Sequence, residues 1–361
     1  MQGVTQSTGT PCIRVDHVAL RSFVENIYLA CGVNTHDAQL LADSLVQADL
    51  WGHQSHGVLR TFWYADRFAS GATQIEAPPQ IVTDAGAVCV IDGRDGIGQS
   101  LAAIAMQEAI KRANAYGVGA ASVRNSGHFG TAMYFSRMAA QADCIGIVTT
   151  NASPAMAPWG GREKRVGNNP WSIAAPAGQY QPFMFDMANT VVARGKLYLA
   201  RSRNEKIPLG WAIDQDGVNT TDPQAGILGN ILPVGGHKGY GISLAMDVLS
   251  GILSASAFAD SVHGPYEPDK RSGVGHFMLA LHISAFRPLT EFIADMERML
   301  ATMKNAPRGK GVGEIFYPGE IEARADTLQR EAGIQLPQDT FDELNRRAAP
   351  LGVKALAGLV S

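Results

Sequence analysis

The sequence predicts an α/β protein whose N-terminal part is mainly helical. Between residues 14 and 70, apolar side chains recur at helical spacing, for example at Ile27, Cys31, Leu41 and Leu45. From Pro78 onward, short runs rich in β-branched residues alternate with helical patterns. The 39 glycines cluster in short runs, where a backbone turns tightly or approaches a ligand. We therefore expect a helical region followed by a region that contains a sheet and helices.

Composition excludes several classes of protein. The 361 residues, 46% hydrophobic and 17% charged, fit a globular protein of two or three structural units. A net charge of -3 gives no basic surplus for a nucleic-acid partner, and no run approaches the roughly 18 to 20 apolar residues of a membrane span. The four cysteines are scattered without a CxxC pair, which predicts buried thiols rather than disulfides or a metal site. We expect a cytoplasmic protein that needs no metal.

Three helices are predicted before the first strand. The polar start, MQGVTQSTGTPCIRV, is expected to be a loose tail. An amphipathic helix over residues 15–31 ends before Gly32, and a second helix begins at Asn34 or Thr35. The third helix covers residues 59–69 and closes at Gly71.

Strands and helices alternate after Pro78. Strands are predicted at residues 80–82, 87–92, 117–123, 144–151, 171–175, 182–187 and 277–283. Helices are predicted at residues 101–116, 131–142, 191–203, 242–255, 292–303, 322–332 and 339–348. Residues 204–229 are polar and rich in turn residues, which predicts a surface excursion. The helix over residues 242–255 is apolar nearly all round, so it belongs to a core or to a subunit interface.

The run Gly96-Ile97-Gly98 resembles the beginning of a dinucleotide-binding fingerprint. It lacks the third glycine, and no acidic residue closes a second strand about twenty residues further on. We interpret it as a glycine-rich turn that opens the next helix. A Rossmann domain is not expected.

The segment QADLWGHQSHGVLRTFWY concentrates candidate catalytic groups. If His56 lies near the start of the third helix, Arg60 and Tyr64 follow on the same face. Imidazole exchanges protons near neutral pH, and guanidinium binds carboxylate as a fork, so these residues suit a small 2-hydroxy or 2-oxo acid. The structural alternative is a turn that caps a helix, with Arg60 paired to an acid and the aromatic residues in a core. Surface or hydrogen-bonded core histidines are the interpretation for His17, His36, His53, His263 and His276.

Polar and glycine-rich segments follow several predicted strands. RNSGHFG comes directly after the strand at residues 117–123, where α/β proteins often place binding groups. The long connection over residues 152–169 is rich in Gly, Pro and Asn, and long ordered loops are frequently functional. GGHKGYG precedes the apolar helix. These segments are the candidate binding loops.

Six of these segments, taken in order, resemble the malate/L-lactate dehydrogenase family. They are QADLWGHQSHGVLR, VRNSGHFGTAMYFSRMAA, IGIVTTNASPAMAPWGGREKRVGNNPWSIAAP, FDMANTVVARGK, GGHKGYG and YPGE. The family includes ureidoglycolate dehydrogenase, sulfolactate dehydrogenase, diketogulonate reductase and piperideine-2-carboxylate reductase.

The resemblance implies a fold and an assembly. It implies a non-Rossmann, mixed and largely antiparallel sheet covered by helices, beside a helical domain formed from both chain ends. We set the helical domain at residues 1–75 plus 305–361 and the cofactor- and substrate-binding domain at residues 76–304. A homodimer with sites near the interface is also implied.

The resemblance assigns the reacting groups. His56 matches the proton donor and acceptor, with Ser55 as its orienting partner, and Arg60 matches the group that binds the substrate carboxylate. His128 matches a second histidine that some members use as the base, so either histidine remains a candidate. Tyr64 and Asn168 are the further substrate-binding candidates.

Cofactor contacts are assigned to four short segments. They are His128, Phe129, Gly130, Thr131 and Ala132; Asp186, Met187 and Ala188; His237 and Lys238; and Pro318, Gly319 and Glu320. Backbone N–H groups at a strand-to-helix turn can meet phosphate or amide oxygens, Asp186 can accept from ribose hydroxyls, and Lys238 is a point charge suited to a phosphate. The cofactor is NAD or NADP, with NAD favoured. Arg162, Lys164 and Arg165 are either a solvated face or a site for the extra phosphate of NADP.

Two departures from the family pattern concern the substrate. Asn168 stands where many members have Thr, which changes the shape of the pocket. Lys196 stands where the imino-acid-reducing members have Asp, and a cation cannot orient an imidazolium as a carboxylate does. We therefore expect a dehydrogenase of a small 2-hydroxy acid of the malate, lactate or ureidoglycolate type. The alternatives are a reductase of a cyclic imino acid or a diketo sugar acid, and a non-catalytic nucleotide-binding member.

Overall fold

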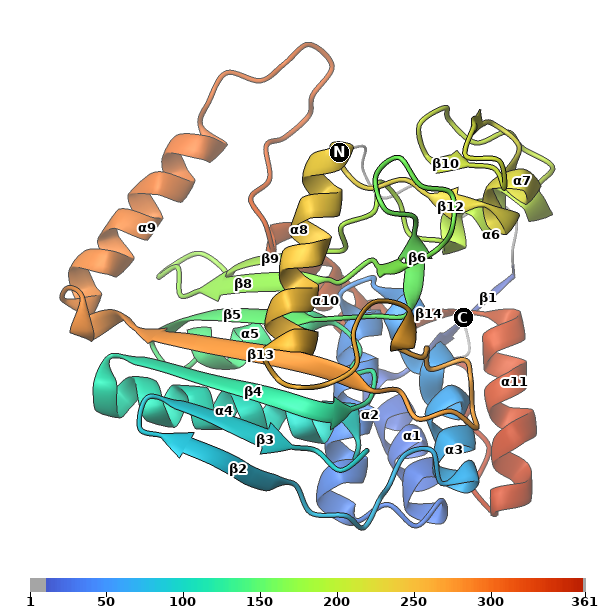
Figure 1. Ribbon diagram of the computed structural model, residues 1–361, viewed down its shortest axis with the longest axis horizontal. Helices are drawn as coiled ribbons and strands as arrows, with labels where there is room; N and C mark the ends of the chain where they lie inside the picture. Colours follow the sequence, from blue (N-terminus) through green and yellow to red (C-terminus); the bar gives the residue numbers. More distant parts are fainter. Residues whose placement is uncertain (1–10, 360–361) are drawn as a thin grey trace. The chain divides into compact units, whose positions relative to one another are not determined.

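The computed structural model describes residues 11–359, which divide into two compact units. The first unit contains the described residues up to Ala69 and those from Ile321 onward, and the second contains Ser70–Glu320. Figure 1 labels their helices and strands. Residues 70–75 and 305–320, which the resemblance assigns to the helical domain, belong to the second unit.

Helices dominate the first unit. They are α1 (His17–Ala30), α2 (Thr35–Leu50), α3 (Thr61–Ser70), α10 (Glu320–Ala332) and α11 (Gln338–Ala348). The carboxylate of Asp16 accepts hydrogen bonds from the first turn of α1, and the side chain of Asn34 does the same for α2. Of the two predicted starts for α2, Asn34 is therefore the N-cap.

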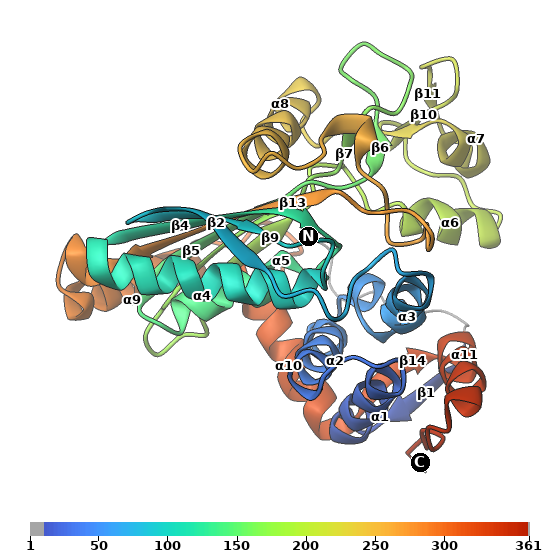
Figure 2. The ribbon, with the colours of Figure 1, turned by 60° about the horizontal axis from the view of Figure 1, so that its bottom comes forward.

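A two-stranded antiparallel sheet joins the two ends of the chain within the first unit. Strand β1 (Cys12–Val15) pairs with β14 (Ile334–Pro337), with Cys12 opposite Pro337 and Val15 opposite Ile334. Figure 2 shows the two strands beside α11. The expectation of a loose tail is thus wrong for residues 12–15, because a partner strand more than 300 residues away orders them. Residues 1–10 lie outside the described residues.

The second unit is built on a seven-stranded sheet of order β2-β3-β4-β13-β5-β8-β9. The strands are β2 (Gln80–Ala85), β3 (Val88–Asp92), β4 (Val118–Ser126), β5 (Cys144–Thr150), β8 (Trp171–Ala175), β9 (Phe183–Met187) and β13 (Val274–His282). Only the β3–β4 pair is parallel among the adjacent pairs of this sheet. The expected mixed, largely antiparallel sheet is confirmed, and with it the absence of a Rossmann arrangement.

Helices cover both faces of this sheet. In Figure 2, α4 (Gly98–Tyr116) and α5 (Ala132–Ala140) lie on one face and α8 (His237–Asp247) lies on the other, while α9 (Leu289–Lys304) follows β13. The approach of α4 to β4 is close, because a Cβ at Gly119 would stand 2.0 Å from the carbonyl oxygen of Ala109. No helix within residues 11–359 has the length and apolar character that a bilayer crossing demands.

A small lobe interrupts the second unit between β9 and α8. Its sheet has the order β11-β10-β12, with β10 (Ala212–Ile213), β11 (Asn219–Thr220) and β12 (Asn230–Ile231), and α6 (Gly195–Ser202) and α7 (Pro223–Leu228) pack with it. A separate apolar core holds the lobe together: Val192, Leu197, Ala200, Ile207, Ala212, Ile227 and Ile231. The predicted surface excursion is therefore a folded element. The predicted loop 152–169 likewise contains a short hairpin, β6 (Pro154–Met156) with β7 (Val166–Gly167).

Candidate active site

His56 lies in a tight turn between α2 and α3. One 3₁₀ turn covers Gln54–His56 and another covers Val58–Arg60, and the extended backbone of Gly57 (φ -88°, ψ -154°) separates them. The hydroxyl of Ser55 lies 2.9 Å from Nδ1 of His56. This contact engages Nδ1, so proton exchange with a substrate falls to Nε2. Ser55 thus has the geometry of an orienting partner.

The charge state of His56 follows from its surroundings. Burial of the imidazole, with smaller contributions from the nearby Arg60 and His53, lowers the pKa of His56 to about 3. At neutral pH the ring is therefore uncharged. An uncharged imidazole is the form that accepts a proton, as a base must in the oxidation of an alcohol.

Asp49, which the sequence analysis did not single out, supports this turn. The residue is 1% exposed, and its carboxyl group accepts a hydrogen bond of 2.8 Å from the backbone N–H of Val58. Burial raises the pKa of Asp49 to about 8. A Cβ at Gly57 would stand 2.0 Å from Oδ1 of Asp49, so only glycine fits there. An acidic residue inside the apolar pattern of α2 was the available signal.

Arg60 and Tyr64 do not share a helical face with His56. Because Gly57 breaks the helical path, α3 begins only at Thr61, and the expected arrangement on one face is wrong. Nε of Arg60 donates to the carbonyl oxygen of Ser55 at 2.7 Å, and the guanidinium stands 4.3 Å from the ring centroid of Trp63. Tyr64 is 5% exposed. The structure thus fixes Arg60 beside the His56 turn and buries Tyr64.

His128 lies in the second unit, in the connection from β4 to α5. Its Nδ1 accepts a hydrogen bond of 3.2 Å from the backbone N–H of Gly130, which has φ +88°. No atom of the described residues lies near the position of a Cβ at Gly130, so a ligand can approach the backbone here. The turn at Gly98 packs against this connection, because a Cβ there would stand 2.4 Å from the carbonyl oxygen of Gly127. The glycines at 96–98 therefore serve a close contact in a non-Rossmann fold.

A buried histidine stands behind the His128 connection. His276, on β13, is fully buried, with Nε2 at 2.7 Å from Oγ of Ser126 and Nδ1 at 2.8 Å from Oγ1 of Thr150. Its ring centroid lies 4.6 Å from that of Phe129. Burial lowers the pKa of His276 to about 3, so the ring is neutral. The interpretation of His276 as a hydrogen-bonded core residue is confirmed.

Asp186 at the end of β9 connects two of the predicted cofactor segments. Its Oδ2 accepts a hydrogen bond of 2.7 Å from the backbone N–H of Met133, in the first turn of α5. The run Asp186, Met187 and Ala188 therefore lies against the segment that ends at Ala132. A carboxylate at the N-terminus of a helix is favourably placed in the field of the helix dipole.

Two asparagines that the sequence analysis missed fix the neighbourhood of Asn168. Asn169 is fully buried; its side chain accepts from Ala152 N–H at 2.9 Å and donates to the carbonyl oxygen of Ser243 at 2.8 Å. Asn189 donates through its backbone N–H to the carbonyl oxygen of Asn168 at 2.9 Å and through Nδ2 to that of Asn169 at 2.7 Å. These bonds leave the position of Asn168 tightly determined. The turn-rich motif GNNP was the available signal for Asn169.

The last two cofactor segments lie at a helix start and in a loop. His237 and Lys238 are the first residues of α8, both exposed, after two glycines of positive φ; the ring of Trp159 lies 6.1 Å from that of His237. The carbonyl oxygen of Pro318 accepts from Met184 N–H at 3.0 Å, which ties the 318–320 loop to β9. Nζ of Lys304 donates to Glu320 at 2.6 Å, so this carboxylate already has a partner. The residues present fit a dinucleotide: an open backbone at Gly130, an exposed ammonium at Lys238 and a carboxylate at Asp186. Among residues 11–359, no group of three or more His, Cys, Asp or Glu is arranged to hold a metal ion.

Fold and motifs together define an α/β enzyme class outside the Rossmann dehydrogenases. The sequence profile of the family described as malate/L-lactate dehydrogenase matches residues 15–345. The chain belongs to this family of hydroxy acid oxidoreductases, as the motifs had indicated.

Individual relatives resemble most of the chain. It is 39% identical over 352 residues to a malate dehydrogenase of Pyrococcus abyssi, covering 95% of this chain and 96% of the relative. It is 40% identical over 322 residues to the L-sulfolactate dehydrogenase of Methanocaldococcus jannaschii, covering 89% and 92%. The solved structure of sulfolactate dehydrogenase from that organism superposes with a TM-score of 0.90 at 37% identity, covering 95% of this chain and 98% of that one.

The names of two further relatives differ in cofactor. The ureidoglycolate dehydrogenase (NAD(+)) of Escherichia coli is 33% identical over 337 residues, covering 92% of this chain and 95% of the relative. The (2R)-3-sulfolactate dehydrogenase (NADP(+)) of Chromohalobacter salexigens is 34% identical over 322 residues, covering 88% and 93%. Both cofactors thus occur among relatives of similar distance.

Proposed function

We propose that the chain catalyses the reversible oxidation of a small 2-hydroxy acid of the malate, lactate or ureidoglycolate type to the 2-oxo acid. The nicotinamide cofactor, when bound, accepts or returns the hydride. The observation that carries this proposal is the turn of Ser55, His56 and Arg60. It holds an uncharged imidazole, a serine hydroxyl on its Nδ1 and a guanidinium next to it.

Each side chain has a separate role in the proposal. His56 takes the hydroxyl proton at Nε2 in oxidation and returns it in reduction, and Ser55 holds the ring in the required orientation. Arg60 binds the substrate carboxylate, which fixes the face of the carbinol carbon that is presented to the cofactor. His128, Asn168 and Tyr64 complete the candidate substrate contacts. His56 is preferred as the base because of its contact with Ser55.

The cofactor contacts are proposed to be the four segments that the resemblance assigned. Open backbone at Gly130 and the exposed ammonium of Lys238 support a pyrophosphate-bearing ligand. Asp186 is proposed to accept from a ribose hydroxyl through a carboxylate that α5 already orients. We propose NAD as the cofactor, as named for the ureidoglycolate dehydrogenase relative, with NADP as the alternative.

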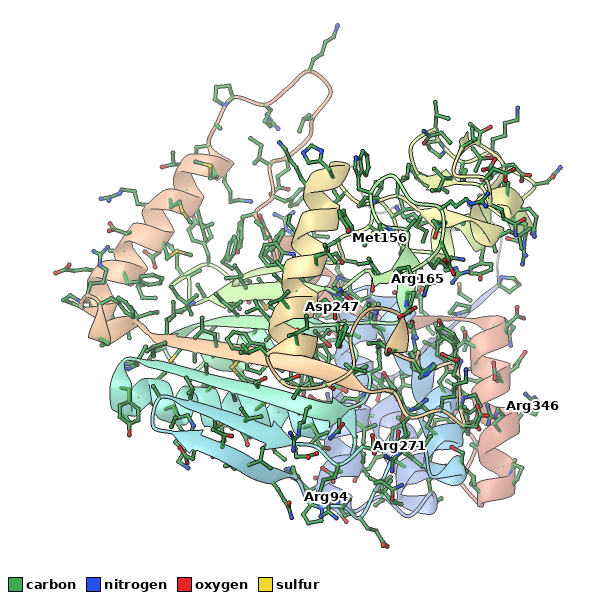
Figure 3. The ribbon with its side chains drawn as sticks, viewed as in Figure 1. Arg94, Met156, Arg165, Asp247, Arg271 and Arg346 are labelled. Carbon is green, nitrogen blue, oxygen red and sulfur yellow. The ribbon has the colours of Figure 1, made fainter. Side chains whose placement is uncertain are left out.

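A homodimer is proposed from the surface of α8 and the turn that follows it. Helix α8 buries small and polar residues, Gly239, Ser243 and Asp247, and exposes Leu244. Beyond its end, Ile252 and Leu253 are each 56% exposed. Asp247, labelled in Figure 3, accepts hydrogen bonds from Asn151 and Ala259. The polar face of α8 therefore packs against the interior of the unit. An apolar face turned outward is typical of a subunit interface. Replacing Ile252 by Asp should convert a dimer into a monomer in size-exclusion chromatography with light scattering, whereas an unchanged mass would contradict the proposed interface.

The test of the reaction is an absorbance assay with a substrate panel. Oxidation of NADH and of NADPH is followed separately with pyruvate, oxaloacetate, 3-sulfopyruvate and a cyclic imine, and reduction of NAD and NADP is followed with ureidoglycolate. Turnover with a 2-oxo acid or its 2-hydroxy acid is the expected result. Turnover with the cyclic imine alone would overturn the proposal in favour of an imine reductase.

A further inference from the structure

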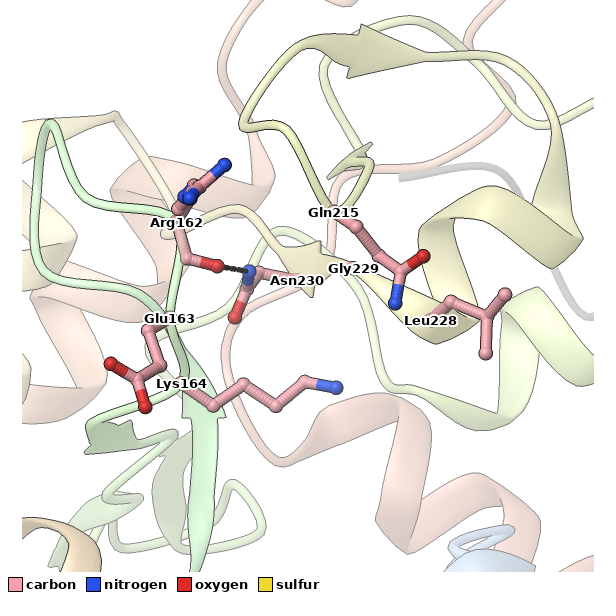
Figure 4. Close-up of a pocket in the computed structure, with 7 residues that line it drawn as sticks. All are labelled: Arg162, Glu163, Lys164, Gln215, Leu228, Gly229 and Asn230. Carbon is pink, nitrogen blue, oxygen red and sulfur yellow. Dashed lines mark hydrogen bonds between the residues drawn. The ribbon is translucent and has the colours of Figure 1, made fainter.

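A cavity of about 570 Å³ opens in the second unit beside the small lobe. Residues 162–164, Gln215 and residues 228–230 line it, as Figure 4 shows. The proposed function uses none of these residues. A cavity of this volume falls within the range that small-molecule ligands occupy.

The lining has one cation without a compensating acid. Arg162 pairs with Asp216 at 3.5 Å and Glu163 pairs with Arg165 at 2.9 Å, so these charges are balanced. Lys164 is half-buried, and no carboxylate of the part of the chain that the structure describes lies within ion-pair distance of its ammonium. Burial and the nearby positive charge of Arg194 lower the pKa of Lys164. An ammonium without an acidic partner in the cavity wall, with the further positive charge of Arg194 nearby, favours the binding of an anion.

Asn230 adds an unsatisfied acceptor to the same wall. The residue is 2% exposed, and its Nδ2 donates to the carbonyl oxygen of Arg162 at 2.8 Å. Its Oδ1 accepts no hydrogen bond from any residue among 11–359. Figure 4 shows this oxygen directed to the side along which the Lys164 side chain runs. A buried acceptor without a donor is costly, so a ligand hydroxyl that donates to it is favoured.

We propose that this cavity binds a phosphate ester that carries a hydroxyl group next to its phosphate. The phosphate contacts the ammonium of Lys164, and the hydroxyl donates to Oδ1 of Asn230. A phosphate monoester brings negative charge and several acceptor oxygens to the ammonium of Lys164, and the nearby positive charge of Arg194 adds to the attraction. The cavity is therefore assigned to a phosphate ester, which differs in chemical class from the small 2-hydroxy acid of the proposed reaction.

Two sources offer this chemistry. One is the 2′-phosphate of NADP with the neighbouring ribose hydroxyl, and this source rests on the proposed function. Its support is that the loop with Arg162 and Lys164 also holds Trp159, whose ring faces the proposed cofactor residue His237 at 6.1 Å. The other source is a free sugar or polyol phosphate, which is independent of the proposed function.

The first experiment measures binding to the full-length protein by titration calorimetry. The probes are NADPH, NADH and glycerol 3-phosphate, and the variants are Lys164→Met and the control Lys206→Met. Lys206 is an exposed lysine of the small lobe, and it does not line the cavity. Loss of a charge-assisted contact should weaken the ligand of this site about tenfold or more in Lys164→Met, while Lys206→Met changes it less than twofold. Lys164→Arg should retain most of the affinity.

The three probes distinguish the sources. Weaker binding of NADPH with unchanged binding of NADH would assign the cavity to the cofactor's extra phosphate. Weaker binding of glycerol 3-phosphate with both dinucleotides unchanged would assign it to a free phosphate ester. If Lys164→Met weakens no phosphate-bearing probe more than Lys206→Met does, the proposal is overturned, whether or not the enzyme turns over a 2-hydroxy acid.

The second experiment tests the hydroxyl contact. Glycerol 3-phosphate is compared with propyl phosphate, which lacks the hydroxyl groups, on the wild type and on Asn230→Ala. We expect the wild type to prefer glycerol 3-phosphate about fivefold or more and the variant to lose this preference. Because both ligands are measured on the same preparation, the ratio is insensitive to a partly unfolded fraction. A preference that persists in Asn230→Ala would remove Asn230 from the site.

Discussion

Different kinds of contact hold the two candidate acid/base histidines in place. The partners of the His56 turn are close in sequence: Ser55 is its neighbour, and the carboxyl of Asp49 bonds to Val58 N–H nine residues further on. The His128 connection instead depends on His276, which bonds to Ser126 across 150 residues of sequence. The first turn is therefore specified by one short segment. The second exists only when the sheet has formed.

Substitutions in the two regions should therefore have different consequences. A substitution in the His56 turn should affect the chemistry or the turn itself. A substitution at His276 should lower the free energy of unfolding, and it should affect turnover only indirectly.

Replacing His56 by Ala should lower kcat by about two to four orders of magnitude, the usual contribution of a general acid or base. The dissociation constant of NADH, measured by fluorescence, should stay within about twofold, because the proposed cofactor contacts lie in other segments. His128→Ala is the matched variant and should cost less turnover than His56→Ala. Equal turnover in His56→Ala and the wild type would remove His56 from the mechanism.

Replacing Gly57 by Ala should destabilise the protein by about 1 to 3 kcal/mol or more, as overpacking of a filled site does. The cause is steric, because the new Cβ would stand 2.0 Å from Oδ1 of Asp49, while the backbone at residue 57 is extended and accepts any residue. Urea denaturation gives the free energy of unfolding.

A double-variant cycle sharpens this prediction. Gly57→Ala combined with Asp49→Ala should cost less than the sum of the two single changes, because each removes the reason for the other's penalty. Strict additivity would show that the two residues do not interact.

The same contrast explains how much the sequence could predict. The His56 turn and the glycine-rich strand ends could be found because their residues are contiguous. The non-Rossmann sheet came from six motifs in order. Two features depend on residues far apart in the chain: the strand register that brings His276 to Ser126, and the pairing of β1 with β14. Neither could be predicted from local sequence patterns. The break at Gly57 could not be predicted from helical spacing, because that rule takes no account of the contact between residue 57 and the carboxyl of Asp49.

Replacing His276 by Phe should lower the free energy of unfolding by about 1 to 3 kcal/mol. The aromatic ring roughly keeps the volume but leaves the hydroxyl of Ser126 without its partner in a buried site. Turnover should fall less than in His56→Ala. His263→Phe is the control, since His263 is part-exposed beside Glu267 and its loss should stay within about 0.5 kcal/mol. A His276→Phe variant as stable as the control would mean that the buried bonds do not support the sheet.

The smallest expected effect is a displaced pH profile. In the free enzyme the pKa of His56 is about 3, whereas an ordinary histidine titrates near 6.5. Oxidation needs the uncharged ring, and a lowered pKa keeps it uncharged to a lower pH. kcat/KM for oxidation should therefore stay level from about pH 8 to about pH 5 and fall only below that.

The profile of kcat should differ from that of kcat/KM in a definite direction. After burial, the largest cause of the low pKa of His56 is the positive charge of Arg60. A bound substrate carboxylate neutralises that charge, so the pKa of His56 should rise in the complex and the acid limb of kcat should lie at higher pH than the limb of kcat/KM. Both limbs are measured over the same pH range, with preincubated samples to separate titration from unfolding. An acid limb of kcat/KM near pH 6.5, the value of an ordinary histidine, would contradict His56 as the base.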